Sequence, residues 1–117
     1  MTSPNLASVT TMNAWTQAGD LGLTEEEILD VDPSEAYKIE SIFLCNADTV
    51  NTCTATLEIS VNNGTNYYYL CNGLVIPPAT TISIIDRPLF LDEEDLIRGT
   101  ASAAGDIDYV ISGTFIE

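Results

Sequence analysis

The sequence predicts an all-β fold, namely an antiparallel β-sandwich, jelly-roll-like, with seven to eight short strands and an N-terminal arm. Hydrophobic and polar residues alternate with a period of two along most of the chain, which is typical of strands with one buried face. Turn-forming residues recur at intervals of about 8–12 residues, as they do in sandwiches. The length of 117 residues suits one domain with a single modest core.

The clearest strand pair is expected in the middle of the chain. Residues 53–61 alternate strictly, and Asn62-Asn63-Gly64-Thr65 follows them with the strongest short hairpin signal. Residues 66–76 suit the return strand, which ends at Pro77-Pro78 because proline cannot donate to a ladder. These residues therefore predict a β-hairpin.

Shorter strands are expected on both sides of this hairpin. Thr24-Glu25-Glu26-Glu27 could instead open a single helical turn as a capping box, but Asp32-Pro33 follows too soon for a stable helix. The further strands are expected at residues 27–31, 37–45, 80–86, 89–91, 96–103 and 107–116.

The first 24 residues differ from the rest, being small and polar with the chain's single tryptophan, Trp15. Residues 1–24 are expected to be either an arm that orders on a neighbour or a first strand (7–15) plus a loop, and residues 25–117 the sandwich domain. Trp15 is then either a satellite core residue or an anchor in a partner's pocket.

The charge balance argues against several classes of partner. The chain has eighteen acidic residues, three basic ones (Lys38, Arg87, Arg98) and no histidine, which gives a formal net charge of −15. Such a surface repels phosphates and anionic lipid, so we expect neither nucleic acid nor membranes as partners. No apolar run approaches the ~20 residues of a membrane span, and we expect no secretory signal at the N-terminus.

The same composition argues against catalysis. Without histidine and with one lysine, no cysteine or serine has an obvious activating base, so we expect no enzyme and no cofactor. Three acidic stretches could bind calcium, although solvated turns explain them better: Asp30-Val31-Asp32, Asp92-Glu93-Glu94-Asp95 and Asp106-Ile107-Asp108.

Three cysteines cannot build a full disulfide framework. Cys45 and Cys53 would lie close together if their strands formed a hairpin, so a bridge between them is one alternative. We prefer the other, in which Cys45, Cys53 and Cys71 are small, buried, apolar residues.

Six stretches in the later part of the chain form a recognisable pattern of strands and turns. They are Ser41-Ile42-Phe43-Leu44-Cys45-Asn46, Thr54-Ala55-Thr56-Leu57-Glu58-Ile59, Leu74-Val75-Ile76-Pro77, Arg87-Pro88-Leu89-Phe90-Leu91, Asp95-Leu96-Ile97-Arg98 and residues 101–113. Through these stretches, and not through a catalytic motif, residues 28–117 resemble a group of small virion proteins of tailed bacteriophages. The longer turn between Cys45 and Cys53, these two cysteines and the heavier acidity depart from that pattern. The resemblance implies a virion structural role, assembly in the host cytoplasm and no active site.

From this resemblance we expect a capsid decoration (cement) protein that binds the major capsid protein or other virion proteins, in trimers or other small oligomers. The alternative is a tail, neck or fibre component that adapts other virion proteins or binds host-surface glycans. Expected contacts are Trp15 and exposed rings among Tyr67, Tyr68 and Tyr69. Alternation would place Tyr67 and Tyr69 on one face and Tyr68 on the other, so at least one should be in the core.

Overall fold

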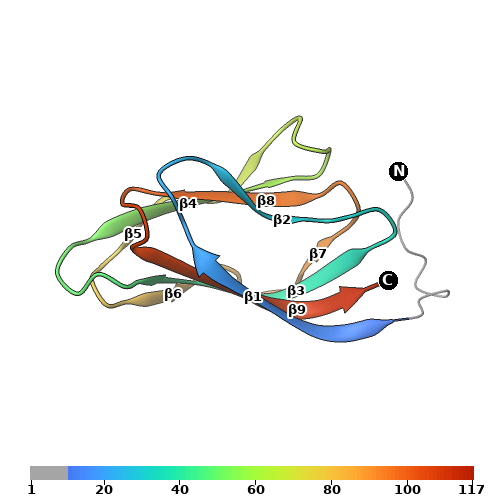
Figure 1. Cartoon of the computed structure of the whole chain (residues 1–117), viewed down its shortest axis with the longest axis horizontal. Helices are drawn as coiled ribbons and strands as arrows, with labels where there is room; N and C mark the ends of the chain where they lie inside the picture. Colours follow the sequence, from blue (N-terminus) through green and yellow to red (C-terminus); the bar gives the residue numbers. More distant parts are fainter. Residues whose placement is uncertain (1–10) are drawn as a thin grey trace.

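The computed structural model describes residues 11–117, which form two antiparallel sheets packed face to face (Figure 1). The described residues contain no helix, so the predicted fold class is confirmed and the alternative of a helical turn at residues 24–27 is wrong. The strands are β1 (Met12–Asp20), β2 (Glu26–Asp30), β3 (Ala36–Asn46), β4 (Cys53–Ser60), β5 (Tyr68–Ile76), β6 (Thr81–Ser83), β7 (Leu89–Leu91), β8 (Leu96–Ala101) and β9 (Ile107–Ile116).

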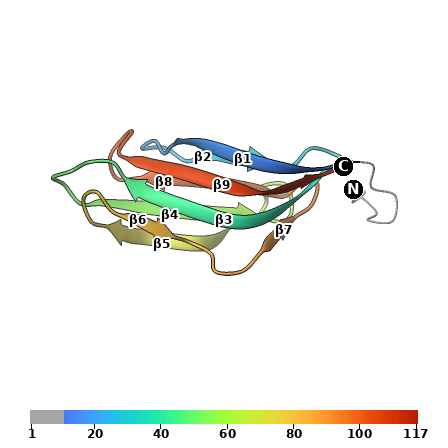
Figure 2. The ribbon, with the colours of Figure 1, turned by 90° about the horizontal axis from the view of Figure 1, so that it is seen from below.

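The strand order is that of a jelly roll. The first sheet runs β1-β9-β3-β6, with β7 also paired to β3, and the second runs β2-β8-β4-β5. Strands from the two ends of the chain pair with each other, and strands nearer the middle pair in turn: β1 with β9, β2 with β8, β3 with β6 and β7, and β4 with β5. This is the pairing expected when one long hairpin folds into two sheets. In Figure 2 the edge strands β1 and β2 lie at one side of the sandwich, and β5 and β6 at the other.

The core lies between the sheets, because alternate residues of each strand point into it. At its centre, Ile39, Ile42 and Leu44 of β3 are fully buried. Other strands of the same sheet and of the facing sheet complete it with the following buried side chains: Ala55, Leu57, Ile76, Leu91, Ile97, Ile107 and Ile111.

A bulge in β3 keeps this inward pattern in phase. The register against β9 shifts between Ile39 and Ser41, which leaves Glu40 as the extra residue. Opposite the bulge stands Gly113, where an added Cβ would run into the backbone carbonyl of Lys38. The bulge therefore requires glycine at position 113.

The predicted hairpin at residues 53–76 is confirmed, since β4 and β5 pair antiparallel. Asn63 and Gly64 have φ values of 58° and 78°, which are the positive angles that an Asn-Gly turn needs. Because β5 begins only at Tyr68, the connection is longer than a two-residue turn.

The hairpin considered for Cys45 and Cys53 does not form. β3 belongs to the first sheet and β4 to the second, so the loop between them crosses from one layer to the other. All three cysteines are free; Cys53 is buried, whereas Cys45 and Cys71 are only half-buried.

The crossing loop is held by Asn46, which is fully buried at the end of β3. Its Nδ2 donates to the carbonyl oxygens of Asn51 and Ile76 at 2.9 and 3.0 Å, and its Oδ1 accepts from the N–H of Asp48 at 3.0 Å. One amide thus satisfies backbone groups of the crossing loop and of the last residue of β5.

Candidate partner-binding surfaces

The four residues predicted as contacts do not form one surface. Trp15 is on β1, at the edge of the first sheet, whereas Tyr68 and Tyr69 are on β5, at the far edge of the second. The described part of residues 1–24 places residues 12–20 in the first sheet. The expected first strand (7–15) therefore starts outside the described residues, and the observed strand continues beyond it to Asp20.

Trp15 faces inward. Its ring centroid lies 4.7 Å from that of Tyr37, which in turn lies 5.2 Å from Phe115. The indole is half-buried and packs against the core. Trp15 thus packs as a satellite of the core, and its contact with a partner stays a prediction.

Tyr67 is also engaged within the molecule. The Arg98 guanidinium carbon lies 3.3 Å from the centroid of its ring, a cation–π contact. Arg98 also pairs with Glu25 at 2.9 Å and with the buried Glu58 at 3.3 Å. Tyr67 therefore covers an ion-pair network on the outer face of the second sheet.

Tyr68 and Tyr69 are both exposed, at 61% and 62%. Tyr67 is only half-buried and none of the three tyrosines belongs to the core, so the expectation of at least one core ring is wrong. The register between β4 and β5 shifts twice, around Leu57, and each shift leaves one extra residue on β5 after Tyr69. Tyr68 and Tyr69 themselves pair in regular register with Ile59 and Glu58 on the edge strand of the second sheet.

The acidic loops do not gather into a metal site. Among residues 11–117 no group of three or more His, Cys, Asp or Glu side chains is placed to hold a metal ion. The loop after β7 instead docks on the loop after β2, with the N–H of Ser34 donating to Glu93 Oε2 at 3.0 Å. Glu93 is 3% exposed, and its other carboxylate oxygen is buried without a hydrogen-bond partner.

Two carboxyl groups in these loops have raised pKa values. Burial raises the pKa of Asp95, and the charge of Asp92 raises it further. Burial likewise raises the pKa of Glu35, with Asp32 and Glu117 adding to the effect. For these two side chains the fold favours the protonated form.

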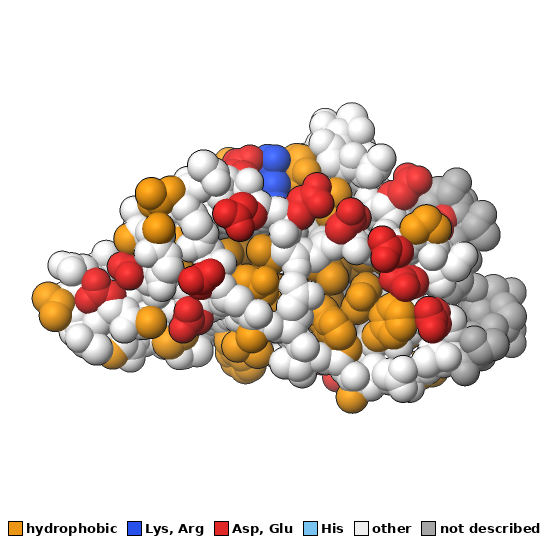
Figure 3. All heavy atoms as spheres, in the orientation of Figure 1, with side chains coloured by type: hydrophobic (Ala, Val, Ile, Leu, Met, Phe, Trp, Pro, Cys, Tyr) orange, Lys and Arg blue, Asp and Glu red, His pale blue; other side chains and the backbone are white. Residues whose placement is uncertain are grey.

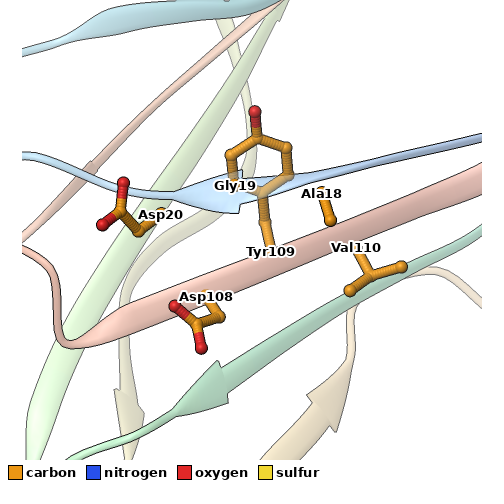
Figure 4. Close-up of a pocket in the computed structure, with 6 residues that line it drawn as sticks. All are labelled: Ala18, Gly19, Asp20, Asp108, Tyr109 and Val110. Atoms are coloured by element: carbon orange, nitrogen blue, oxygen red, sulfur yellow. The ribbon is translucent and has the colours of Figure 1, made fainter.

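A shallow depression of about 460 Å³ lies at the end of β1. Figure 4 shows the ring of Tyr109 standing beside Gly19, with Asp108 and Val110 on the other side of their strand. A Cβ at Gly19 would come within 2.8 Å of the Tyr109 hydroxyl, so glycine makes room for the ring. Asp20 pairs in register with Asp108, which places two carboxylates at this end of the edge.

The described residues include no helix long and apolar enough to cross a membrane.

No protein-family model matches the sequence, and no curated protein matches it significantly. Among solved structures, the chain is similar to a pentameric capsid protein isolated from metagenomic phage sequences, with 16% identity and a TM-score of 0.38. The similarity covers 86% of this chain, which spans 59% of the length of that protein.

Proposed function

We propose that this chain is a non-enzymatic virion structural protein, and specifically a capsid decoration (cement) protein that stabilises the head by binding capsid subunits. The observation that carries the proposal is the exposed pair Tyr68 and Tyr69 on the bulged edge strand β5. Tyrosine is enriched in protein interfaces, because it brings a large contact area and a polar hydroxyl at a small cost in side-chain entropy.

Three further features support this role. Double-sheet jelly rolls occur in viral capsid domains, as well as in lectins, although fold alone never determines function. The likeness of residues 28–117 to virion proteins of tailed phages points the same way. A surface with a net charge of −15 would also keep coated particles apart.

Capsid binding is tested with Tyr68→Ser/Tyr69→Ser. Co-sedimentation with purified capsid shells should show at least about tenfold weaker binding for this double variant, since aromatic anchors dominate interface energies. The matched control is Phe90→Ser, because Phe90 is an equally exposed aromatic (67%) on β7. Unchanged binding by the double variant would show that the tyrosine edge is not the capsid contact.

A tail, neck or fibre component is the second candidate, and the same tyrosines favour it, since exposed aromatic faces can stack on sugar rings. Copy number in purified particles separates the two. Quantitative mass spectrometry should find on the order of hundreds of copies for a decoration protein and about six to eighteen for a tail or neck ring, because each position imposes its own symmetry.

We also propose that the protein forms small homo-oligomers, with trimers as the expected form. Light scattering coupled to size-exclusion chromatography would give the mass in solution. A monomer at all concentrations would remove this part of the proposal and leave capsid binding untouched.

A further inference from the structure

Among the described strands, three of the four sheet edges carry features that block pairing with another chain. β2 has a bulge at Ile28 and bears three exposed acidic residues, and β5 is bulged twice. β6 and β7 are three residues each and are preceded by prolines. Bulges, charges, prolines and short length are the usual protections of an edge strand.

β1 has none of these protections. It is nine residues long and pairs with β9 in one unbroken register from Met12 to Asp20. The stretch from Met12 to Gly19 contains no proline and no charged side chain. A long, regular and uncharged edge is a template for an added strand.

The register shows which backbone groups of β1 are available. Thr11 and Glu117 exchange both of their N–H···O bonds at 3.0 Å, so they are a hydrogen-bonded pair of the antiparallel ladder. Hydrogen-bonded pairs recur at every second residue, and Trp15 and Gln17 therefore point their N–H and C=O groups toward β9. The backbone groups directed to the open edge are those of Met12, Ala14, Thr16 and Ala18.

The side chains of β1 leave this edge accessible. Ala14, Thr16 and Ala18 are small and exposed, so another backbone can approach. Gln17 points inward, and its Nε2 donates to the carbonyl of Ile28 on β2, which ties the two sheets together at this edge. The strand is therefore held in place before a partner arrives.

Charge decides which partner fits. Figure 3 shows hydrophobic side chains along the open edge between β1 and β2, bordered by acidic side chains. Glu26, Glu27 and Asp30 of β2 are exposed beside this edge, and Asp20 lies at its end. A second copy of this chain would bring the same acids against them, which opposes pairing between copies.

We propose that β1 is a docking edge for an extended segment of a partner protein that carries lysine or arginine, which adds to the first sheet as a further strand. Main-chain hydrogen bonds to Met12, Ala14, Thr16 and Ala18 hold the segment, and the surrounding carboxylates select its positive charge. The edge strand β1 lies opposite the tyrosines of β5. A test of docking at β1 is therefore independent of the capsid contact proposed above.

Amide hydrogen exchange by NMR tests the proposal directly on the wild-type protein. The probe is a synthetic peptide of alternating lysine and valine, compared with its glutamate-valine counterpart. In the free protein the amides of Asn13, Trp15 and Gln17 are protected by β9, whereas those of Ala14 and Thr16 exchange quickly. Saturation with the lysine peptide should protect the second set, and added salt should weaken binding.

A substitution pair isolates the backbone donor. Thr16→Pro removes an N–H that points to the open edge and takes no part in pairing with β9, and edge strands accept proline there. Thr16→Val retains the donor and serves as the matched control. Thr16→Pro should bind the lysine peptide at least about tenfold more weakly than Thr16→Val, because the peptide is left with an unpaired carbonyl.

Three outcomes would overturn the proposal. The first is peptide binding without new protection at Ala14 and Thr16, and the second is equal affinity for the glutamate peptide. The third is protection of these amides that rises with protein concentration in the absence of peptide, since that would make a second copy the occupant. If Thr16→Pro fails to fold, as thermal unfolding would reveal, the exchange pattern of the wild-type protein still decides.

Discussion

Replacement of Arg98 by methionine removes the positive charge at the centre of the second sheet's outer face. The guanidinium lies 2.9 Å from Glu25 and 3.3 Å from Glu58, and the ring of Tyr67 covers it. The Glu58 side chain is 11% exposed, so the substitution leaves a nearly buried carboxylate without its counter-charge. That loss costs about 3–5 kcal/mol in buried pairs.

The expected cost lies at the lower end of this range. The side chain of Arg98 is itself 24% exposed, and Glu25 is 50% exposed, so its own pair contributes at most about 1 kcal/mol. Loss of the cation–π contact adds about 0.5–1 kcal/mol. We therefore expect Arg98→Met to lower the free energy of unfolding by about 3 kcal/mol.

Urea denaturation at pH 7, followed by circular dichroism, measures this loss as a fall of about 2 M in the midpoint. A double-mutant cycle with Glu58→Gln isolates the pair, because the amide keeps the shape of the carboxylate without its charge. The double variant should be more stable than Arg98→Met alone, since no charge is then left buried. A loss below about 0.5 kcal/mol for Arg98→Met, or additive effects in the cycle, would refute this account of the network.

Three further predictions follow from the packing and the charges. Gly113→Ala should lower the free energy of unfolding by about 3 kcal/mol, because the methyl group meets a backbone carbonyl across the bulge; Gly73→Ala, with open space around it but a φ of 61°, should cost only about 1 kcal/mol. Asn46→Ala should cost about 2 kcal/mol in the same urea assay, since buried carbonyls lose their donor; an unchanged midpoint would count against its role in the crossing loop. Thermal unfolding across pH should show a contribution of Glu35 and Asp95 that is more favourable to the folded state near pH 4 than at pH 7, because their pKa values are raised in the fold and their protonated forms are the better-tolerated ones. This contribution is complete below the pKa values of the unfolded chain and is lost as the pH rises through the raised values of the folded state. A melting temperature that rises steadily from pH 4 to pH 7 would contradict this.

Local pattern was sufficient for most of the strands. The alternation at residues 53–61 and the Asn-Gly turn after it correctly predicted the β4–β5 hairpin, because both signals act between neighbours in the chain. The alternative of a hairpin that joins Cys45 and Cys53 is wrong because the two strands follow each other in sequence but belong to different sheets. The short connection was compatible with either arrangement, and only the packing of the whole sandwich decides between them.

The tyrosines were harder to predict for a related reason. Two bulges shift the register of β5 against β4, and Gly73, a glycine inside the strand with a positive φ, is a signal that could have indicated one of them. Tyr67 looked like one of three equivalent rings, yet it lies on Arg98, a residue of β8. A contact between residues far apart in the chain thus distinguishes Tyr67 from the two exposed rings.

The importance of β1 also depends on topology. The sequence shows that no charged residue precedes Asp20 in a chain with 18 acids, which is the signal that could have drawn attention to this strand. The consequence of such an uncharged stretch depends on where its strand lies. In a central strand both sets of backbone groups are paired within the sheet, whereas at an edge one set remains open to a partner. Since β1 and β5 lie at opposite edges, a chain that docks through both would connect two partners rather than cover one. A variant with Thr16→Pro and another with Tyr68→Ser/Tyr69→Ser should then each retain one partner, whereas loss of both partners in either variant would mean that the two edges form a single site.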